Sequence, residues 1–158
     1  LIIGGSYGKI GAITLASRAV LSSGAGLVTA FVPRCGYSIL QSSFPEAMVC
    51  TDVNDDIITH IKYNLEPTVI GVGVGLGTHE KTILAFENFL KSNKTPLVID
   101  ADGLNILASK KDLLKLLPKQ TVLTPQTVID ATAFQSGIYW IRVVSDERLT
   151  TFKVMIQR

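Results

Sequence analysis

Cysteine and histidine are scarce in this sequence, which limits the metal and redox chemistry that it can carry. Among its 158 residues there are two cysteines, Cys35 and Cys50, and two histidines, His60 and His79. Two cysteines form one disulfide at most, and their spacing is not that of a zinc site or a CxxC redox motif. We therefore predict no metal site, two buried apolar cysteines in a reducing compartment such as the cytoplasm, and two histidines on the surfaces of helices.

The sequence also lacks an excess of one charge and a long hydrophobic run. Fifteen Lys and Arg residues against thirteen Asp and Glu residues give a formal net charge of +2, which is too small to favour nucleic acid as a partner. No apolar stretch approaches the ~20 residues that span a bilayer, and the start at Leu1 has no basic segment of a signal peptide. With 47% hydrophobic and 18% charged residues, the composition is that of one packed domain without a membrane partner.

Short apolar runs alternate with helical patterns from residue 1 to residue 125. The runs, which we interpret as buried parallel strands, cover residues 1–3, 27–32, 68–72, 97–99 and 122–123. Apolar residues at helical spacing between them predict helices around residues 12–20, 57–61, 83–90 and 113–117. This alternation predicts an α/β fold with a doubly wound, mostly parallel sheet. Two β-rich runs, 138–144 and 151–156, then predict a C-terminal antiparallel β hairpin.

Glycine and acidic residues gather where the predicted strands end, which is where open α/β sheets bind ligands. The segments are Gly4-Gly5-Ser6 with the stretch to Ala12, then Gly73-Val74-Gly75-Leu76-Gly77, then Asp100-Ala101-Asp102-Gly103-Leu104-Asn105. Glycines let a backbone approach a ligand, helix N-termini offer amides to anions, and buried carboxylates need partners. Each segment also has a simpler interpretation as tight packing, a plain turn or, at Asp102, a helix cap. The first segment is not a Walker loop, because Lys9 is followed by Ile10, where a Walker loop has a Ser or Thr hydroxyl that binds Mg²⁺.

Five segments in this order resemble one family. They are residues 1–12, residues 23–29, residues 73–77 with Val74 where the family has proline, residues 98–105, and Val122-Leu123-Thr124-Pro125. Residues 1–125 therefore resemble part of the ADP/ATP-dependent NAD(P)H-hydrate dehydratases, the carbohydrate-kinase-like domain of the ribokinase superfamily. The Asp102-Gly103-Leu104-Asn105 segment favours this branch over the sugar and thiazole kinases of the same superfamily.

The resemblance implies a lyase of nucleotide repair that removes water from hydrated NADH or NADPH. ADP or ATP would turn the hydroxyl into a phosphate leaving group with help from Mg²⁺, so the partners would be the hydrated dinucleotide and an adenine nucleotide. By the same resemblance, Ala12 and Gly75 line the substrate site, and its walls are shaped by Gly5, Ser6, Gly73 and Gly77. Contacts within the cleft would come from Asp100, Asp102 and Asn105. The carboxylates of the two aspartates would suit a magnesium-bound water network.

Residues 126–158 depart from the family pattern. Gln126-Thr127-Val128 stands where the family has a histidine followed by Pro-x-Glu, and no later GxGD segment supplies the family's catalytic aspartate. We therefore assign no catalytic residue, expect residues 1–125 to be the front part of the family domain, and leave open whether this chain is active. The tail loosely resembles the family's own hairpin and more closely a C-terminal sorting module of type IX secretion, and it also fits an ordinary hairpin at a sheet edge.

Two other functions fit the same residues. Gly5, Gly8 and Gly11 have the spacing of a variant dinucleotide-binding loop, and Arg34 after the second predicted strand would suit NADP rather than NAD. Alternatively, the chain could be a non-catalytic binding or assembly subunit that keeps the substrate side of the fold. Incomplete sheets expose apolar edges, so we also expect the chain to form homo-oligomers.

Overall fold

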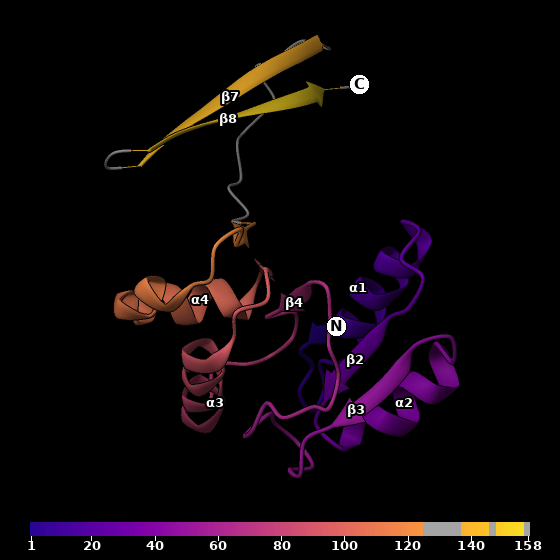
Figure 1. The fold of residues 1–158 in the computed structure, drawn as a ribbon. Helices are drawn as coiled ribbons and strands as arrows, with labels where there is room; N and C mark the ends of the chain where they lie inside the picture. The colour runs from indigo at the N-terminus through magenta and orange to yellow at the C-terminus, as the bar shows by residue number, and fades with distance from the viewer. Residues whose placement is uncertain (125–136, 146–147, 157–158) are drawn as a thin grey trace. The chain divides into compact units, whose positions relative to one another are not determined.

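A computed structural model describes residues 1–124, 137–145 and 148–156, in two units, Leu1–Pro125 and Gln126–Arg158 (Figure 1). The strands of the first unit are β1 (Ile2–Ile3), β2 (Thr29–Val32), β3 (Met48–Thr51), β4 (Ile70–Val72), β5 (Leu97–Ile99) and β6 (Val122–Leu123). Its helices are α1 (Ile10–Ser22), α2 (Cys35–Ser43), α3 (Glu80–Ser92) and α4 (Asp102–Ser109), followed by the 3-10 helix η1 (Lys111–Leu116).

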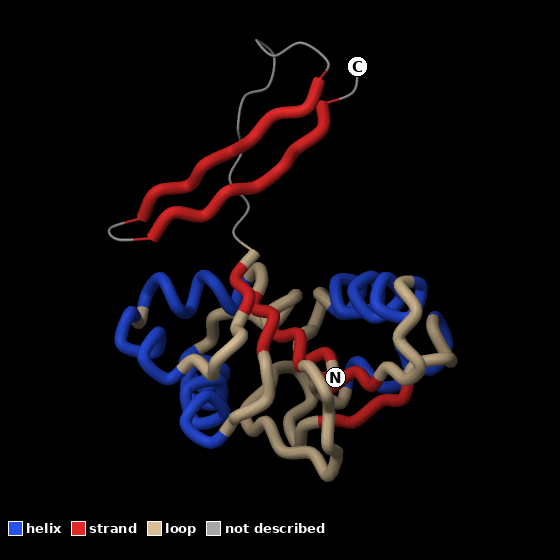
Figure 2. The backbone as a smooth tube through the Cα atoms, turned by 45° about the horizontal axis from the view of Figure 1, so that its top comes forward, coloured by secondary structure: helices blue, strands red, loops and turns tan. Residues whose placement is uncertain are grey.

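The six strands form one parallel sheet in the order β3-β2-β1-β4-β5-β6. The chain runs outward from β1 to β3, crosses back to β4, and then runs outward to β6. Helices lie on both sides of the strands (Figure 2). The prediction of a doubly wound, parallel α/β sheet is therefore confirmed. A sheet of this kind has a crevice at the carboxyl ends of its strands where the strand order reverses, which here is between β1 and β4.

Successive residues of the central strands face two separate hydrophobic cores. Ile3 and Phe31 belong to one core, together with buried side chains of α3 and α4 such as Phe86. Ile2 and Ala30 belong to the other, which α1 and α2 cover. Burial on both faces explains why these strands are continuous apolar runs in the sequence. It also fixes both helical layers against the sheet, which holds the strand ends in place.

The prediction of a helix at residues 57–61 is wrong, because this segment is a loop between β3 and β4. Ile58 is still fully buried, in the core that contains Phe86. The buried carboxylate of Asp52 accepts hydrogen bonds from the backbone N–H groups of Thr59 and His60, the second at 3.1 Å. Acceptors of this kind compete with the hydrogen bonds of a helix. The isoleucine spacing therefore reports burial in a loop, not a helical face.

Other elements differ from prediction in type or position. His60 lies in the same loop, and His79 is the N-cap of α3, where its Nδ1 accepts the backbone N–H of Lys81 at 3.2 Å. The prediction that both histidines lie on the surfaces of helices is therefore wrong. The helix expected at residues 113–117 is the 3-10 helix η1, and α2, β3 and α4 were not predicted.

Both cysteines are free and only half-buried, so the prediction that they are buried is wrong. Burial, with help from the carboxylates of Asp56 and Asp55, raises the pKa of the Cys35 thiol. A raised pKa keeps the thiol protonated, and the thiolate is the nucleophilic form. Cys35 is therefore not an activated nucleophile.

The second unit contains β7 (Gly137–Ser145) and β8 (Arg148–Ile156), which pair antiparallel with Ser145 opposite Arg148. Among the helices that the structure describes, none is long and apolar enough to cross a membrane.

Candidate functional site

The loops that follow β1 and β4 meet at the carboxyl edge of the sheet, where the strand order reverses. The backbone N–H of Gly5 donates a hydrogen bond to the carbonyl of Val74 at 2.8 Å. The buried hydroxyl of Ser6 donates to the carbonyl of Gly75 at 2.9 Å. Two loops that lie far apart in the sequence are thus locked together at the position where such folds bind their ligands.

Close approach of these loops requires glycine at particular positions. A Cβ on Gly4 would lie 2.2 Å from the carbonyl oxygen of Val74, and one on Gly73 would lie 2.0 Å from that of Asp100. Gly73 also has a φ of +122°, which side-chain-bearing residues rarely adopt. Gly75, with a φ of +62°, lies so close to the first turn of α1 that a Cβ would stand 2.7 Å from the carbonyl oxygen of Lys9. The glycines therefore set the spacing between loops rather than simply permitting turns.

Asp102 joins a third strand end to these two loops. One of its carboxylate oxygens accepts the backbone N–H of Gly77 at 2.8 Å and lies 3.7 Å from the ammonium of Lys9. The other accepts the side-chain amide of Asn105 at 3.2 Å. The N-cap position of α4 belongs to Ala101, so Asp102 is not the cap that the simpler interpretation proposed. Its carboxylate instead connects α4, the β4 loop and the start of α1.

Asp100 lies at the base of this arrangement, directly after β5. Its carbonyl approaches Gly73, and its half-buried carboxylate accepts the backbone N–H of Ala101 at 2.7 Å. Ala101 has a φ of +47° and a ψ of −120°, a conformation that non-glycine residues seldom adopt. Strained residues of this kind cluster at ligand sites, where the surrounding structure holds them in place.

The structure brings all nine predicted site residues to this one edge. Gly5, Ser6 and Gly73 are buried inside the interlocked loops. Four more are partly exposed, namely Gly75, Gly77, Asp100 and Asp102. The last two, Ala12 and Asn105, are exposed near the starts of α1 and α4. A Cβ on Gly75 would lie 3.2 Å from that of Ala12, so this pair lines one surface. Sequence reasoning missed Lys9 as a site residue. Its place inside the first glycine loop was the available signal.

These residues do not form a magnesium centre by themselves. Within the described part of the chain, no group of three or more His, Cys, Asp or Glu side chains is placed to hold a metal ion. Asp102 already accepts two hydrogen bonds and has a lysine ammonium nearby, which disfavours a cation at that carboxylate. The oxygen donors that Mg²⁺ prefers are therefore incompletely supplied here.

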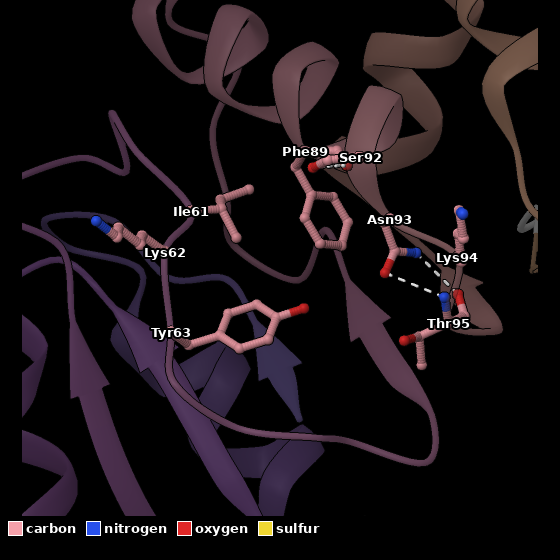
Figure 3. A pocket seen from close by; sticks show the side chains of 8 residues that line it. All are labelled: Ile61, Lys62, Tyr63, Phe89, Ser92, Asn93, Lys94 and Thr95. Atoms are coloured by element: carbon pink, nitrogen blue, oxygen red, sulfur yellow. Dashed lines mark hydrogen bonds between the residues drawn. The ribbon is translucent and has the colours of Figure 1, made fainter.

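A cavity of about 290 Å³ lies elsewhere, beside the segment that leads into the amino end of β5 (Figure 3). The rings of Tyr63 and Phe89 line it, and burial raises the pKa of the Tyr63 hydroxyl. The side chain of Asn93 is occupied there by two hydrogen bonds with the backbone of Thr95, at 2.8 and 3.2 Å. A second cavity of about 420 Å³ is lined by residues such as Phe31 and Asp52. Neither includes a predicted site residue, and we place the candidate site at the strand ends on topology and geometry.

Comparison with known proteins identifies the family. The profile of the family described as NAD(P)H-hydrate dehydratase matches residues 1–135, which is most of the chain. The chain belongs to the NAD(P)H-hydrate dehydratase family. The resemblance found in the five sequence segments is thereby confirmed, and the match continues past Pro125 to residue 135. The likeness of residues 126–158 to a type IX sorting module stays a prediction.

Individual relatives agree with this assignment. The bifunctional NAD(P)H-hydrate repair enzyme Nnr of Moorella thermoacetica is 37% identical over 136 residues, covering 79% of this chain and 25% of that protein. The ADP-dependent (S)-NAD(P)H-hydrate dehydratase of Staphylococcus aureus is 36% identical, covering 72% of this chain and 41% of that protein. An ATP-dependent (S)-NAD(P)H-hydrate dehydratase of Pediculus humanus subsp. corporis is 34% identical, covering 80% of this chain and 43% of that protein.

The fold has a similar solved structure as well. A ribokinase-like superfamily protein of Enterococcus faecalis V583 superimposes with a TM-score of 0.62 at 25% identity, covering 78% of this chain and 43% of that chain. The ribokinase-like assignment of the sheet is therefore confirmed. The chain spans a quarter to about two-fifths of the length of the dehydratase relatives described above.

Proposed function

We propose that this chain binds hydrated NADH or NADPH for an ADP- or ATP-dependent dehydration that restores the reduced nicotinamide nucleotide. One observation carries the proposal. Three strand-end loops of a family member interlock at the point of strand-order reversal, through Gly5–Val74, Ser6–Gly75 and Gly77–Asp102 hydrogen bonds. This geometry leaves the exposed Ala12 and the partly exposed Gly75 side by side on the surface of the crevice.

Each site residue has a role that follows from its position. Ala12 and Gly75 present a flat surface without side-chain bulk, against which a nicotinamide ring can lie. The walls come from Gly5, Ser6, Gly73 and Gly77, which are tied to neighbouring loops. Asp100, Asp102 and Asn105 offer carboxylate and amide groups that can bind ligand hydroxyl or amide hydrogens. The chain's own contribution is to hold and orient the hydrated ring.

The adenine nucleotide supplies the leaving-group chemistry when it is bound. The ring hydroxyl would lose its proton to solvent and receive a phosphoryl group, which leaves the nucleotide one phosphate shorter. The C–O bond would then break with release of inorganic phosphate, and the neighbouring carbon would lose a proton to solvent as the ring double bond forms. ADP and ATP both remain candidates, since relatives are named for each. Because the described residues do not form a magnesium site, no step of this proposal depends on the ion. We also propose a cytoplasmic location, where pyridine nucleotides are used.

The alternative of an NADP-binding glycine loop receives less support. In that fingerprint the third glycine permits close packing of helix and strand. Here a Cβ on Gly8 or Gly11 would meet no atom within 4 Å, so neither glycine serves close packing. The glycines that do meet a neighbouring loop are those of the dehydratase pattern, such as Gly73 and Gly75.

Calorimetric titration of the full chain with hydrated NADPH and with intact NADPH tests the proposal. We expect preferential binding of the hydrated form, and we expect Ala12→Leu to weaken that binding about ten-fold or more by filling the crevice surface. Ala19→Leu is the matched control, because Ala19 is also exposed on α1 but lies two turns further along. Equal binding of hydrated and intact NADPH, or no effect of Ala12→Leu, would refute the proposed site.

A second measurement separates an enzyme from a binding subunit. Addition of ADP or ATP to the complex with hydrated NADPH should restore the absorbance of reduced nicotinamide if the chain catalyses the dehydration. Binding without any recovery of absorbance would favour the non-catalytic binding subunit instead.

A further inference from the structure

Lys9 is a cation at the meeting point of the three loops. It is the residue immediately before α1, and its backbone carbonyl lies against Gly75 and accepts the backbone N–H of Ala12 at 3.2 Å. Its ammonium lies 3.7 Å from the carboxylate of Asp102, with 55% of the lysine side chain exposed against 19% of the aspartate side chain. The ammonium of Lys9 is thus paired with the partly buried carboxylate of Asp102, and much of the lysine side chain remains open to solvent.

The charges of the site favour a cation in this position. The nine residues predicted to contact or shape the substrate site include two carboxylates, Asp100 and Asp102, and no cation. A hydrated dinucleotide carries a negatively charged pyrophosphate, which two uncompensated carboxylates would repel. Among the ion pairs within the described residues, the pair with Lys9 alone involves either carboxylate. Lys9 therefore neutralises Asp102 and still offers hydrogen-bond donors on its exposed side, because an ammonium has three.

We propose that Lys9 binds a phosphate of the hydrated dinucleotide while its ammonium remains paired with Asp102. This inference rests on the proposed function and adds a contact to it. A lysine is suited to this role because it acts as a point charge on a flexible stem and can reach a phosphate without fixed geometry. Charge-assisted hydrogen bonds of this kind are among the stronger polar contacts in proteins.

Two ligands separate a phosphate contact from a structural role. Hydrated NADH carries the pyrophosphate, whereas the hydrate of dihydronicotinamide riboside (the hydrated riboside) has the same hydrated ring and no phosphate. We expect Lys9→Gln to weaken binding of hydrated NADH by about ten-fold or more and to change binding of the hydrated riboside by less than about two-fold. Lys9→Arg should retain most of the affinity for hydrated NADH. Titration calorimetry on the full chain gives all of these values.

The salt dependence of binding supplies a second readout. Loss of an ionic contact to phosphate should make the affinity of Lys9→Gln for hydrated NADH less sensitive to added salt than that of the unaltered chain. The matched control is Lys115→Gln, which removes an exposed lysine paired with Asp112 at 2.8 Å, far from the site in the sequence. This control should match the unaltered chain in both affinity and salt dependence.

Two results would overturn the inference alone. The first is equal affinity of the unaltered chain and Lys9→Gln for hydrated NADH. The second is an equal loss of affinity for both ligands, which would indicate that Lys9 only supports the loops. If the unaltered chain binds neither hydrated ligand, the proposed function fails and this inference fails with it. Circular dichroism and thermal unfolding of each variant show whether a lost affinity reflects a lost fold.

Discussion

Single glycines determine the shape of the candidate site, and they differ in what their neighbours would tolerate. At Gly73 both the backbone conformation and the nearby Asp100 carbonyl exclude a side chain. At Gly11, in the first turn of α1, a Cβ would meet no atom within 4 Å. The sequence shows both as glycines in glycine-rich segments. Only the positions of the neighbouring loops distinguish a required glycine from a replaceable one.

We expect Gly73→Ala to lower the free energy of unfolding by about 2–4 kcal/mol, because the new methyl group would collide with backbone atoms at a strained φ. Gly11→Ala is the matched control, and it should leave the free energy of unfolding unchanged or raise it by up to about 1 kcal/mol, since alanine favours helix. Urea unfolding of both variants measures these differences. Equal stability of the two variants would show that the β4 and β5 loops do not approach as closely as described.

The contacts that complete the site could not be predicted at this scale. The segments containing Lys9, Gly77 and Asp102 were each visible as strand-end motifs. Their hydrogen bonds and ion pair depend on β1, β4 and β5 being neighbours in the sheet. Local sequence patterns do not predict this strand order. Sequence reasoning therefore located the edge of the sheet and most of its residues, but not the cation that balances their charge.

Whole elements were predictable where the apolar spacing is strong and local. α3 illustrates this, because its buried Phe86, Phe89 and Leu90 follow helical spacing. α2 was missed, because its sequence contains Gly36 and serines and its N-cap has no side-chain hydrogen bond. Tertiary contact stabilises it instead, since Gly36 lies against Val32 and lets the helix pack closely on β2.

The loop between β3 and β4 shows the opposite error, in which a helical pattern does not form a helix. Asp52, only 3% exposed, collects hydrogen bonds from the backbone N–H groups of Val53, Thr59 and His60 and from the Thr59 hydroxyl. The loop in turn supports the candidate site, because the carbonyl of Asp56 accepts the backbone N–H of Tyr7 at 2.7 Å. The buried carboxylate of Asp52 therefore holds the shape of the loop, and the backbone of Asp56 links that loop to the first glycine loop.

We expect Asp52→Ala to lower the free energy of unfolding by about 1–3 kcal/mol, because it leaves several partly buried donors without their acceptor. Asp52→Asn should cost less, since its amide oxygen can still accept. The control is Asp112→Ala, which removes a carboxylate that is 93% exposed. Urea unfolding measures stability, and amide hydrogen exchange at Thr59 and His60 should accelerate in Asp52→Ala. Unchanged exchange at both amides would contradict the role given to Asp52.

For the molecule as a whole, the two ends of the six-stranded sheet are where we propose that it associates with further copies. β6 forms one end, and its Val122 and Leu123 are 53% and 40% exposed. β3 forms the other, where Met48 is 46% exposed. Edge strands with exposed apolar side chains and unpaired backbone groups are templates for association with further strands. The expectation of homo-oligomers stays a prediction, and these edges are where we propose that the copies pair.

We expect the full chain to self-associate as its concentration rises, and we expect Val122→Lys to shift the equilibrium toward monomer, because a charged side chain on an edge strand opposes pairing. Leu84→Lys is the matched control, since Leu84 is 55% exposed but lies on α3, away from the sheet edges. Sedimentation velocity over a range of concentrations distinguishes the three proteins. If β6 mediates association, only Val122→Lys changes the sedimentation profile. A monodisperse monomer at every concentration would instead show that the sheet edges are protected in solution.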